Sequence, residues 1–169
     1  MIAPHMRKTS ADLPGAEATA KQVIIANRVS APPVPVASFF TNDGFSVYAA
    51  EFPDQIIIAG FIDLDKKQII LNESDDLEVQ QFTLARALGH WIMHGDELDE
   101  IPELKVIYHQ SLGGDLKNFY EKEALHFALH LLLPEIFIVD DLRLADQAIA
   151  VKYQVPDFVV RLIRKEYLS

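Results

Sequence analysis

The pattern of hydrophobic and polar positions predicts helices at both ends of the chain and short strands between them. Apolar residues recur every three or four positions in the helical segments, and Pro and Gly residues interrupt the pattern. We expect these helices at residues 16–29, 36–40, 74–94, 116–133, 142–153 and 156–167. Short β-rich runs separated by turn residues predict strands at residues 45–52, 55–62 and 67–72.

These elements indicate an α+β fold. Three strands joined by tight turns predict a small three-stranded antiparallel sheet, packed on a helical core with helices at both ends. Residues 1–15 are polar and patternless, and we interpret them as a flexible N-terminal lead-in. Residues 16–169 carry no repeat and no boundary, which favours a single domain of ordinary size.

Composition narrows the function classes. The chain has 169 residues and no cysteine, so thiolate zinc ligands, cysteine nucleophiles and disulfides are all excluded. The net charge of -10 is a poor match for phosphate backbones, and direct nucleic-acid binding is not expected. No apolar run approaches the length of a membrane span and no signal-peptide core is present, so we expect a cytoplasmic protein that does not bind membranes.

The segment of residues 82–94, FTLARALGHWIMH, has the frame of a zinc-protease helix with two of its functional side chains replaced. In a His-Glu-x-x-His motif, two imidazoles one turn apart hold the metal and the Glu activates a water molecule. The corresponding residues here are Arg86, Ala87, Leu88, Gly89 and His90. Only the second histidine of the motif is present.

Together with the segment EKEALHFALHLLLP at residues 121–134, this helix resembles those of the ImmA/IrrE family of zinc metallopeptidases. The segment of residues 144–163 is similar to the closing helical hairpin of that family. The resemblance covers nearly all of the chain after residue 15. It implies a zincin-like metallopeptidase-type fold and an association with repressors of phages and mobile elements or with stress regulators.

The resemblance places the second zinc ligand of the family at His90 and the third at Glu123. The first ligand corresponds to Arg86 and the catalytic base to Ala87, while a family Asn corresponds to Leu125. A guanidinium group stays protonated and offers no lone pair, and an alanine accepts no proton. We therefore expect no catalytic residue, two remnant ligands in a pseudo-active site, and no bound cofactor.

Two arrangements of the altered site are open. In the first, Arg86 replaces the zinc and forms an ion pair with Glu123, because a buried carboxylate without its metal is costly to leave unpaired. In the second, a displaced zinc site uses His94 or His126 as additional ligands beside His90. The ordinary interpretation of His126, as of His130, is a hydrogen-bonded side chain at the edge of the core.

The resulting functional hypothesis is a catalytically impaired pseudopeptidase that regulates a protein partner by binding it. The family implies that this partner is a helix-turn-helix transcriptional repressor. One alternative is an active zinc metallopeptidase that cleaves a repressor through a rearranged site. Others are an enzyme inactivated by introduced mutations at positions 86 and 87, and a structural or toxin–antitoxin-type interaction protein that reuses the scaffold.

Overall fold

A computed structural model describes residues 8–54, 57–109 and 119–169. The chain begins with α1 (Leu13–Ala26) and α2 (Val36–Asn42), followed by β1 (Ser46–Ala50), β2 (Ile58–Asp63) and β3 (Gln68–Asn72). The long helix α3 (Leu77–Met93) then leads into α4 (Gly95–Glu100), a 3-10 turn at Pro102–Lys105 and β4 (Val106–Tyr108). The remaining elements are α5 (Phe119–Leu132), α6 (Glu135–Asp141), α7 (Asp146–Tyr153) and α8 (Asp157–Leu168).

The α+β class is as predicted, but the expected three-stranded antiparallel sheet is wrong. The sheet has four strands in the order β1-β3-β2-β4, and it is mixed. Strand β1 runs parallel to β3, whereas β2 is antiparallel to both β3 and β4. Only β2 and β3 form the expected hairpin.

Two features of the sequence account for this difference. The link from β1 to β2 contains Pro53 and is too long for a tight hairpin, so β1 pairs with the far edge of β3 instead. Strand β4 has three residues, which is too short for an alternating pattern to be recognised. Its position beside β2 is a long-range contact that local patterns do not encode.

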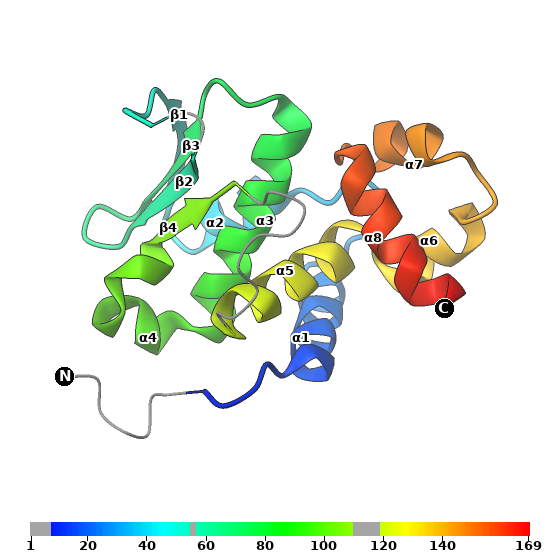
Figure 1. The fold of residues 1–169 in the computed structure, drawn as a ribbon, viewed down its shortest axis with the longest axis horizontal. Coiled ribbons are helices and arrows are strands. Elements are labelled where there is room, and N and C mark those ends of the chain that lie inside the picture. The colour runs from blue at the N-terminus through cyan, green and yellow to red at the C-terminus, as the bar shows by residue number, and fades with distance from the viewer. Residues whose placement is uncertain (1–7, 55–56, 110–118) are drawn as a thin grey trace.

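Helix α3 occupies the middle of the molecule and contacts the sheet on one side and α5 on the other (Figure 1). Two glycines allow these close approaches. A Cβ atom on Gly60 of β2 would lie 3.0 Å from a methyl carbon of Thr83 on α3. A Cβ atom on Gly89 of α3 would lie 2.9 Å from the ring of Phe127 and 3.2 Å from the main chain of Ala124, both on α5. The packing therefore fixes the spacing of α3 and α5.

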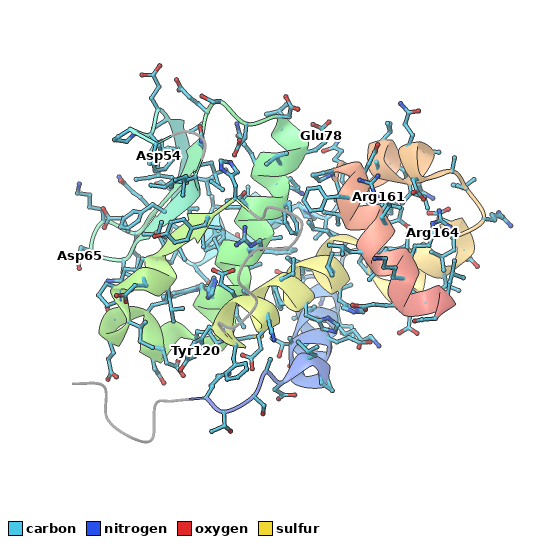
Figure 2. The ribbon with its side chains drawn as sticks, in the orientation of Figure 1. Asp54, Asp65, Glu78, Tyr120, Arg161 and Arg164 are labelled. Atoms are coloured by element: carbon cyan, nitrogen blue, oxygen red, sulfur yellow. The ribbon has the colours of Figure 1, made fainter. Side chains whose placement is uncertain are left out.

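The C-terminal helices form a separate group at one end of the molecule (Figure 1). Arg164 on α8 is directed at the connection between α6 and α7, as Figure 2 shows. Its guanidinium donates to Asp146 and to the carbonyl oxygens of Leu142 and Leu144. This basic residue of α8 thus has a structural role.

Several helix boundaries differ from those predicted. The segment 95–105 lies outside the predicted helices and strands, but it forms α4 and the 3-10 turn, and α6 was not predicted either. Helix α1 begins at Leu13, and α3 begins at Leu77 rather than near residue 74. Residues 116–118 of the helix predicted at 116–133 lie outside the described residues. In the part of the chain that the structure describes, no helix has both the length and the apolar character of a membrane span.

Candidate functional site

The sequence motif and its surroundings form a buried cluster between α3 and the first turn of α5. Arg86, His90 and His94 are four residues apart and therefore share one face of α3. Glu121 and Glu123 extend toward them from α5. Four of these residues are at most 2% exposed, and the side chain of Glu121 is 17% exposed. We call these five residues, with Lys8, the Arg86 cluster.

Arg86 pairs with Glu121, and the predicted pairing with Glu123 is wrong. One terminal nitrogen of the guanidinium donates to Oε2 of Glu121 at 2.8 Å, and the other donates to the carbonyl oxygen of Tyr108 at 2.8 Å. The latter oxygen belongs to β4, the strand that was not predicted. Arg86 therefore joins α3, α5 and the edge of the sheet through charge-assisted hydrogen bonds.

The two histidines connect the two carboxylates in a continuous hydrogen-bonded chain. His90 contacts Glu121 through Nε2 at 3.0 Å and His94 through Nδ1 at 3.1 Å. His94 in turn contacts Oε2 of Glu123 through Nε2 at 2.7 Å. Each imidazole nitrogen can donate or accept according to the tautomer of its ring. The two rings therefore bridge Glu121 to Glu123 through three contacts.

The pKa values of two groups in the cluster are lowered, with opposite effects on their charge. Burial and the neighbouring His90 lower the pKa of His94 to about 4, although Glu123 opposes this shift. Burial raises the pKa of Glu121, but the hydrogen bond from His90 and the charge of Arg86 outweigh it and bring the pKa to about 2. Near neutral pH, Glu121 is therefore ionised and His94 is neutral.

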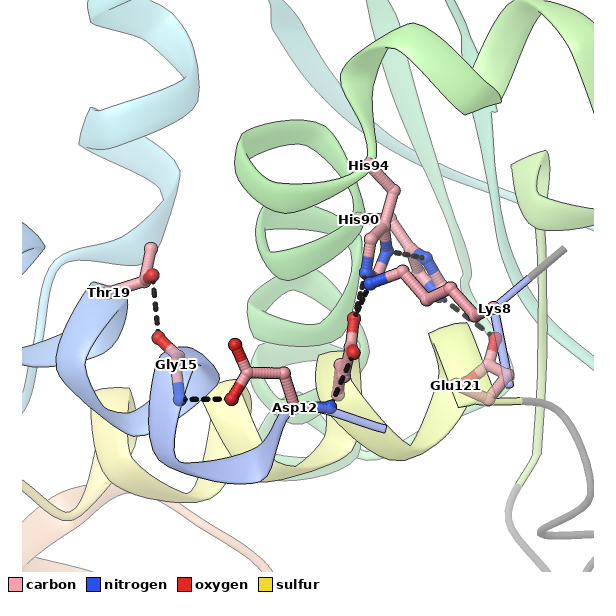
Figure 3. Close-up of polar contacts among 8 residues, drawn as sticks. Lys8, Asp12, Gly15, Thr19, His90, His94 and Glu121 are labelled. Carbon is pink, nitrogen blue, oxygen red and sulfur yellow. Dashed lines mark hydrogen bonds and ion pairs between the residues drawn. The ribbon is translucent and has the colours of Figure 1, made fainter. Parts of the chain in front are cut away.

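The segment preceding α1 contacts Glu123 through Lys8 and Asp12. Figure 3 shows these two residues close to the histidine pair of α3. The ammonium of Lys8 donates to Oε2 of Glu123 at 2.5 Å, and the main-chain nitrogen of Asp12 donates to Oε1 at 2.7 Å. The side chain of Asp12 also accepts from the nitrogen of Gly15 and so caps α1. The hydrogen bonds that Glu123 accepts from the main chain of Asp12, from Lys8 and from His94 outweigh the effect of burial and lower the pKa of Glu123.

The other predicted site residues lie apart from these contacts. Ala87 is fully buried in the hydrophobic core and presents no acceptor. His126 lies three residues beyond Glu123 on α5, and its nearest charged partner is Glu166 of α8, with 3.2 Å between Nδ1 and Oε1. The structure thus brings His90, His94 and Glu123 together and places His126 in a different cluster.

Comparison with known proteins identifies the family. The profile described as "IrrE N-terminal-like domain" matches residues 44–161, which is more than half of the chain. The chain belongs to the IrrE N-terminal-like domain family. Among solved structures, a Mycobacterium tuberculosis transcriptional regulator superposes with a TM-score of 0.62 at 16% sequence identity. The superposition covers 86% of this chain and 45% of the regulator, so the chain spans less than half of that protein, and the likeness concerns the fold alone. No curated protein sequence matches the chain at a significant level.

Membership of the IrrE N-terminal-like family implies zinc, and the Arg86 cluster does not fit that ion. Both ring nitrogens of His90 are engaged, and the oxygens of Glu123 bond to Lys8, Asp12 and His94. The guanidinium of Arg86 brings a permanent positive charge to the position that the sequence resemblance assigns to the first zinc ligand. A cation would have to displace these donors to enter, and two ligands hold zinc weakly.

Four parts of this site were not found from the sequence. Glu121 was identifiable in principle, because it belongs to the same motif segment as Glu123. It also lies one helical turn before residue 125, to which the family Asn corresponds. Lys8 and Asp12 carry no local signal, since they lie in a segment that resembles a flexible lead-in. The carbonyl of Tyr108 could not be predicted, because its strand was not recognised.

Proposed function

We propose that this IrrE-like protein is a regulatory pseudopeptidase, which binds a protein partner without cleaving it. The observation that carries the proposal is the buried ion pair of Arg86 with Glu121. It occupies the position where the first zinc ligand of the family would act. Ala87 supports the same conclusion, because a water molecule beside it would find no general base.

We infer that the partner is a helix-turn-helix transcriptional repressor of a phage, a mobile element or a stress response. Family membership supports this class, and the similar Mycobacterium tuberculosis protein is described as a transcriptional regulator. Binding alone can shift a repressor away from its operator, provided that the binding differs between the free and the DNA-bound states. The proposal places the protein in the cytoplasm, where such repressors act.

The acidic segment after α3 is a suitable docking region for such a partner. Helix α4 follows His94 directly, and Asp96, Asp99, Glu100 and Glu103 are exposed on it and on the 3-10 turn. This negative charge lies beside the Arg86 cluster and complements the basic face with which a repressor contacts DNA. Charge attraction of this kind weakens as the salt concentration rises.

The test measures repressor occupancy and repressor integrity in the same reaction. The purified protein is added to the repressor encoded beside its gene, already bound to operator DNA. We expect a gel shift to show loss of the bound complex while mass spectrometry shows the repressor intact. The double variant Asp99→Asn with Glu100→Gln should weaken this effect and reduce its dependence on salt.

A matched gain-of-function variant sharpens the test. Arg86→His combined with Ala87→Glu restores the His-Glu-x-x-His frame, and we expect it to gain zinc-dependent cleavage of the same repressor. Chelator-sensitive cleavage by the unaltered protein would instead support an active metallopeptidase with a rearranged site. Unchanged operator occupancy with an intact repressor would also contradict the proposal and favour a different interaction role.

A further inference from the structure

Helix α5 carries a pair of histidines beyond Glu123, the second of them about 10 Å along the helix from it, since seven residues rise by that amount. His126 and His130 are four residues apart and share a face of α5. Glu17 of α1 and Glu166 of α8 approach them from the two neighbouring helices. We call these four residues the His126 cluster.

His130 is held in an orientation that leaves one nitrogen without a partner. Its Nε2 lies 2.8 Å from Oε2 of Glu166 and donates to that carboxylate. In a neutral ring, Nδ1 then carries the lone pair. Nδ1 is buried and has no hydrogen-bond partner among the described residues, and His130 is only 3% exposed. The nearest carboxylate oxygen, Oε1 of Glu17, is 4.0 Å away, which is too long for a hydrogen bond.

A buried acceptor without a partner requires an explanation, and here it points toward other potential ligands. Glu17, His126 and His130 each offer one ligand atom, and these atoms all lie within 4.8 Å of one another. Ligand atoms around a tetrahedral zinc ion are roughly 3.4 Å apart, given bonds of about 2.0–2.1 Å. Small side-chain rotations at the partly exposed Glu17 and His126 are sufficient to close this difference.

The groups around the two rings suit a cation. The carboxylates of Glu17 and Glu166 face His126 and His130 from the two neighbouring helices. Two imidazoles and a carboxylate are a donor set that divalent zinc accepts.

We propose that Glu17, His126 and His130 form a binding site for a zinc-class divalent cation, separate from the family's zinc position. Glu166 is a positioning residue, because its hydrogen bond to Nε2 of His130 directs Nδ1 toward the other two ligands. The site connects α1 to α5. The ammonium of Lys21 pairs with Glu17 at 2.9 Å and with Glu135 at 2.7 Å. It keeps Glu135 as a partner when the metal binds Glu17.

The experiment titrates metal-free protein, prepared with a chelator, with Zn²⁺ in a calorimeter. We expect one Zn²⁺ per chain. His126→Asn and Glu17→Gln should each weaken binding by about 10- to 100-fold or more, and Glu166→Gln by about 10-fold. His109→Asn is the matched control, since His109 also pairs with a carboxylate, that of Asp75, but lies outside the His126 cluster, and the affinity of this variant for Zn²⁺ should be unchanged.

Two further measurements keep the result decisive. Co²⁺ in place of Zn²⁺ should give visible absorption bands of a tetrahedral site, and the Glu17→Gln variant should lose them. Because His130 is buried, circular dichroism first establishes that each variant is folded. If a His130 variant does not fold, the variants at the partly exposed His126 and Glu17 provide the test. The proposal is overturned if the protein binds no Zn²⁺, or if His94→Gln abolishes binding while His126→Asn retains it.

Discussion

The Arg86 cluster and the His126 cluster both combine histidines with glutamates and both involve α5, yet their donor atoms are used differently. In the Arg86 cluster, each carboxylate accepts from a neighbouring cation, and both rings of the histidine pair are hydrogen-bonded on both nitrogens. In the His126 cluster, a carboxylate fixes one nitrogen of His130, and the other nitrogen has no hydrogen-bond partner among the described residues. Positive side chains complete the first cluster, and we propose that a metal cation completes the second.

The difference teaches that histidine and glutamate content does not by itself identify a metal site. What matters is whether the protein's own donors already occupy the lone pairs. In the Arg86 cluster, the guanidinium of Arg86 occupies the buried space between α3 and α5 and supplies the positive charge. At the His126 cluster, Lys21 is the nearby cation, and it lies at the exposed edge with an alternative partner.

The largest expected effect comes from removing the cation of the Arg86 cluster. Arg86→Met removes the charge-assisted guanidinium bond to Glu121, which keeps its contact with His90, and it also removes the Arg86 donor from the carbonyl of Tyr108. We expect a loss of about 3–5 kcal/mol in the free energy of unfolding. Urea denaturation measures this quantity. Adding Glu121→Gln should recover a large part of the loss, because the carboxylate that lost the charge of Arg86 is then absent. Equal stability of the single and double variants would show that the ion pair is not the source.

Acid should weaken the Arg86 cluster through His94. Its pKa is about 4 in the folded protein and near 6.5 in the unfolded chain, so the unfolded chain binds more protons between these values. The contribution of His94 to stability is therefore complete above pH 6.5 and is lost as the pH falls to 4, a change of up to about 3 kcal/mol. Unfolding free energies measured across this range should decline less steeply for His94→Gln. Identical slopes for the unaltered protein and His94→Gln would contradict a neutral His94 ring at neutral pH.

The smallest effect concerns the segment that covers Glu123. Lys8→Met removes one of three donors to this carboxylate, and we expect a loss of about 1–2 kcal/mol, typical of a hydrogen bond to a charged group. Lys66→Met serves as the control, because Lys66 is exposed and its partner Asp63 is 3.9 Å away, so less than about 0.5 kcal/mol should be lost. If both variants unfold at the same urea concentration, the contact with Glu123 contributes nothing.

Local patterns were sufficient for most helices and for the motif, and they failed where distant segments meet. The spacing of Arg86 and His90 placed both on one face of α3, because a helical period is a local property. The choice of Glu121 over Glu123 as the partner of Arg86 depends on how α3 and α5 pack at Gly89. The parallel pairing of β1 with β3, the edge strand β4 and the contact of Lys8 are long-range features. None of them leaves a periodic signal in the sequence.

The hydrogen bond from the main chain of Asp12 to Glu123 tolerates most substitutions at position 12. The donor is a peptide nitrogen, so almost any residue at position 12 can still provide it. Proline is the exception, because it has no amide hydrogen. This bond to Glu123 therefore depends on the path of the main chain before α1, whereas the contact from Lys8 is lost when that side chain changes.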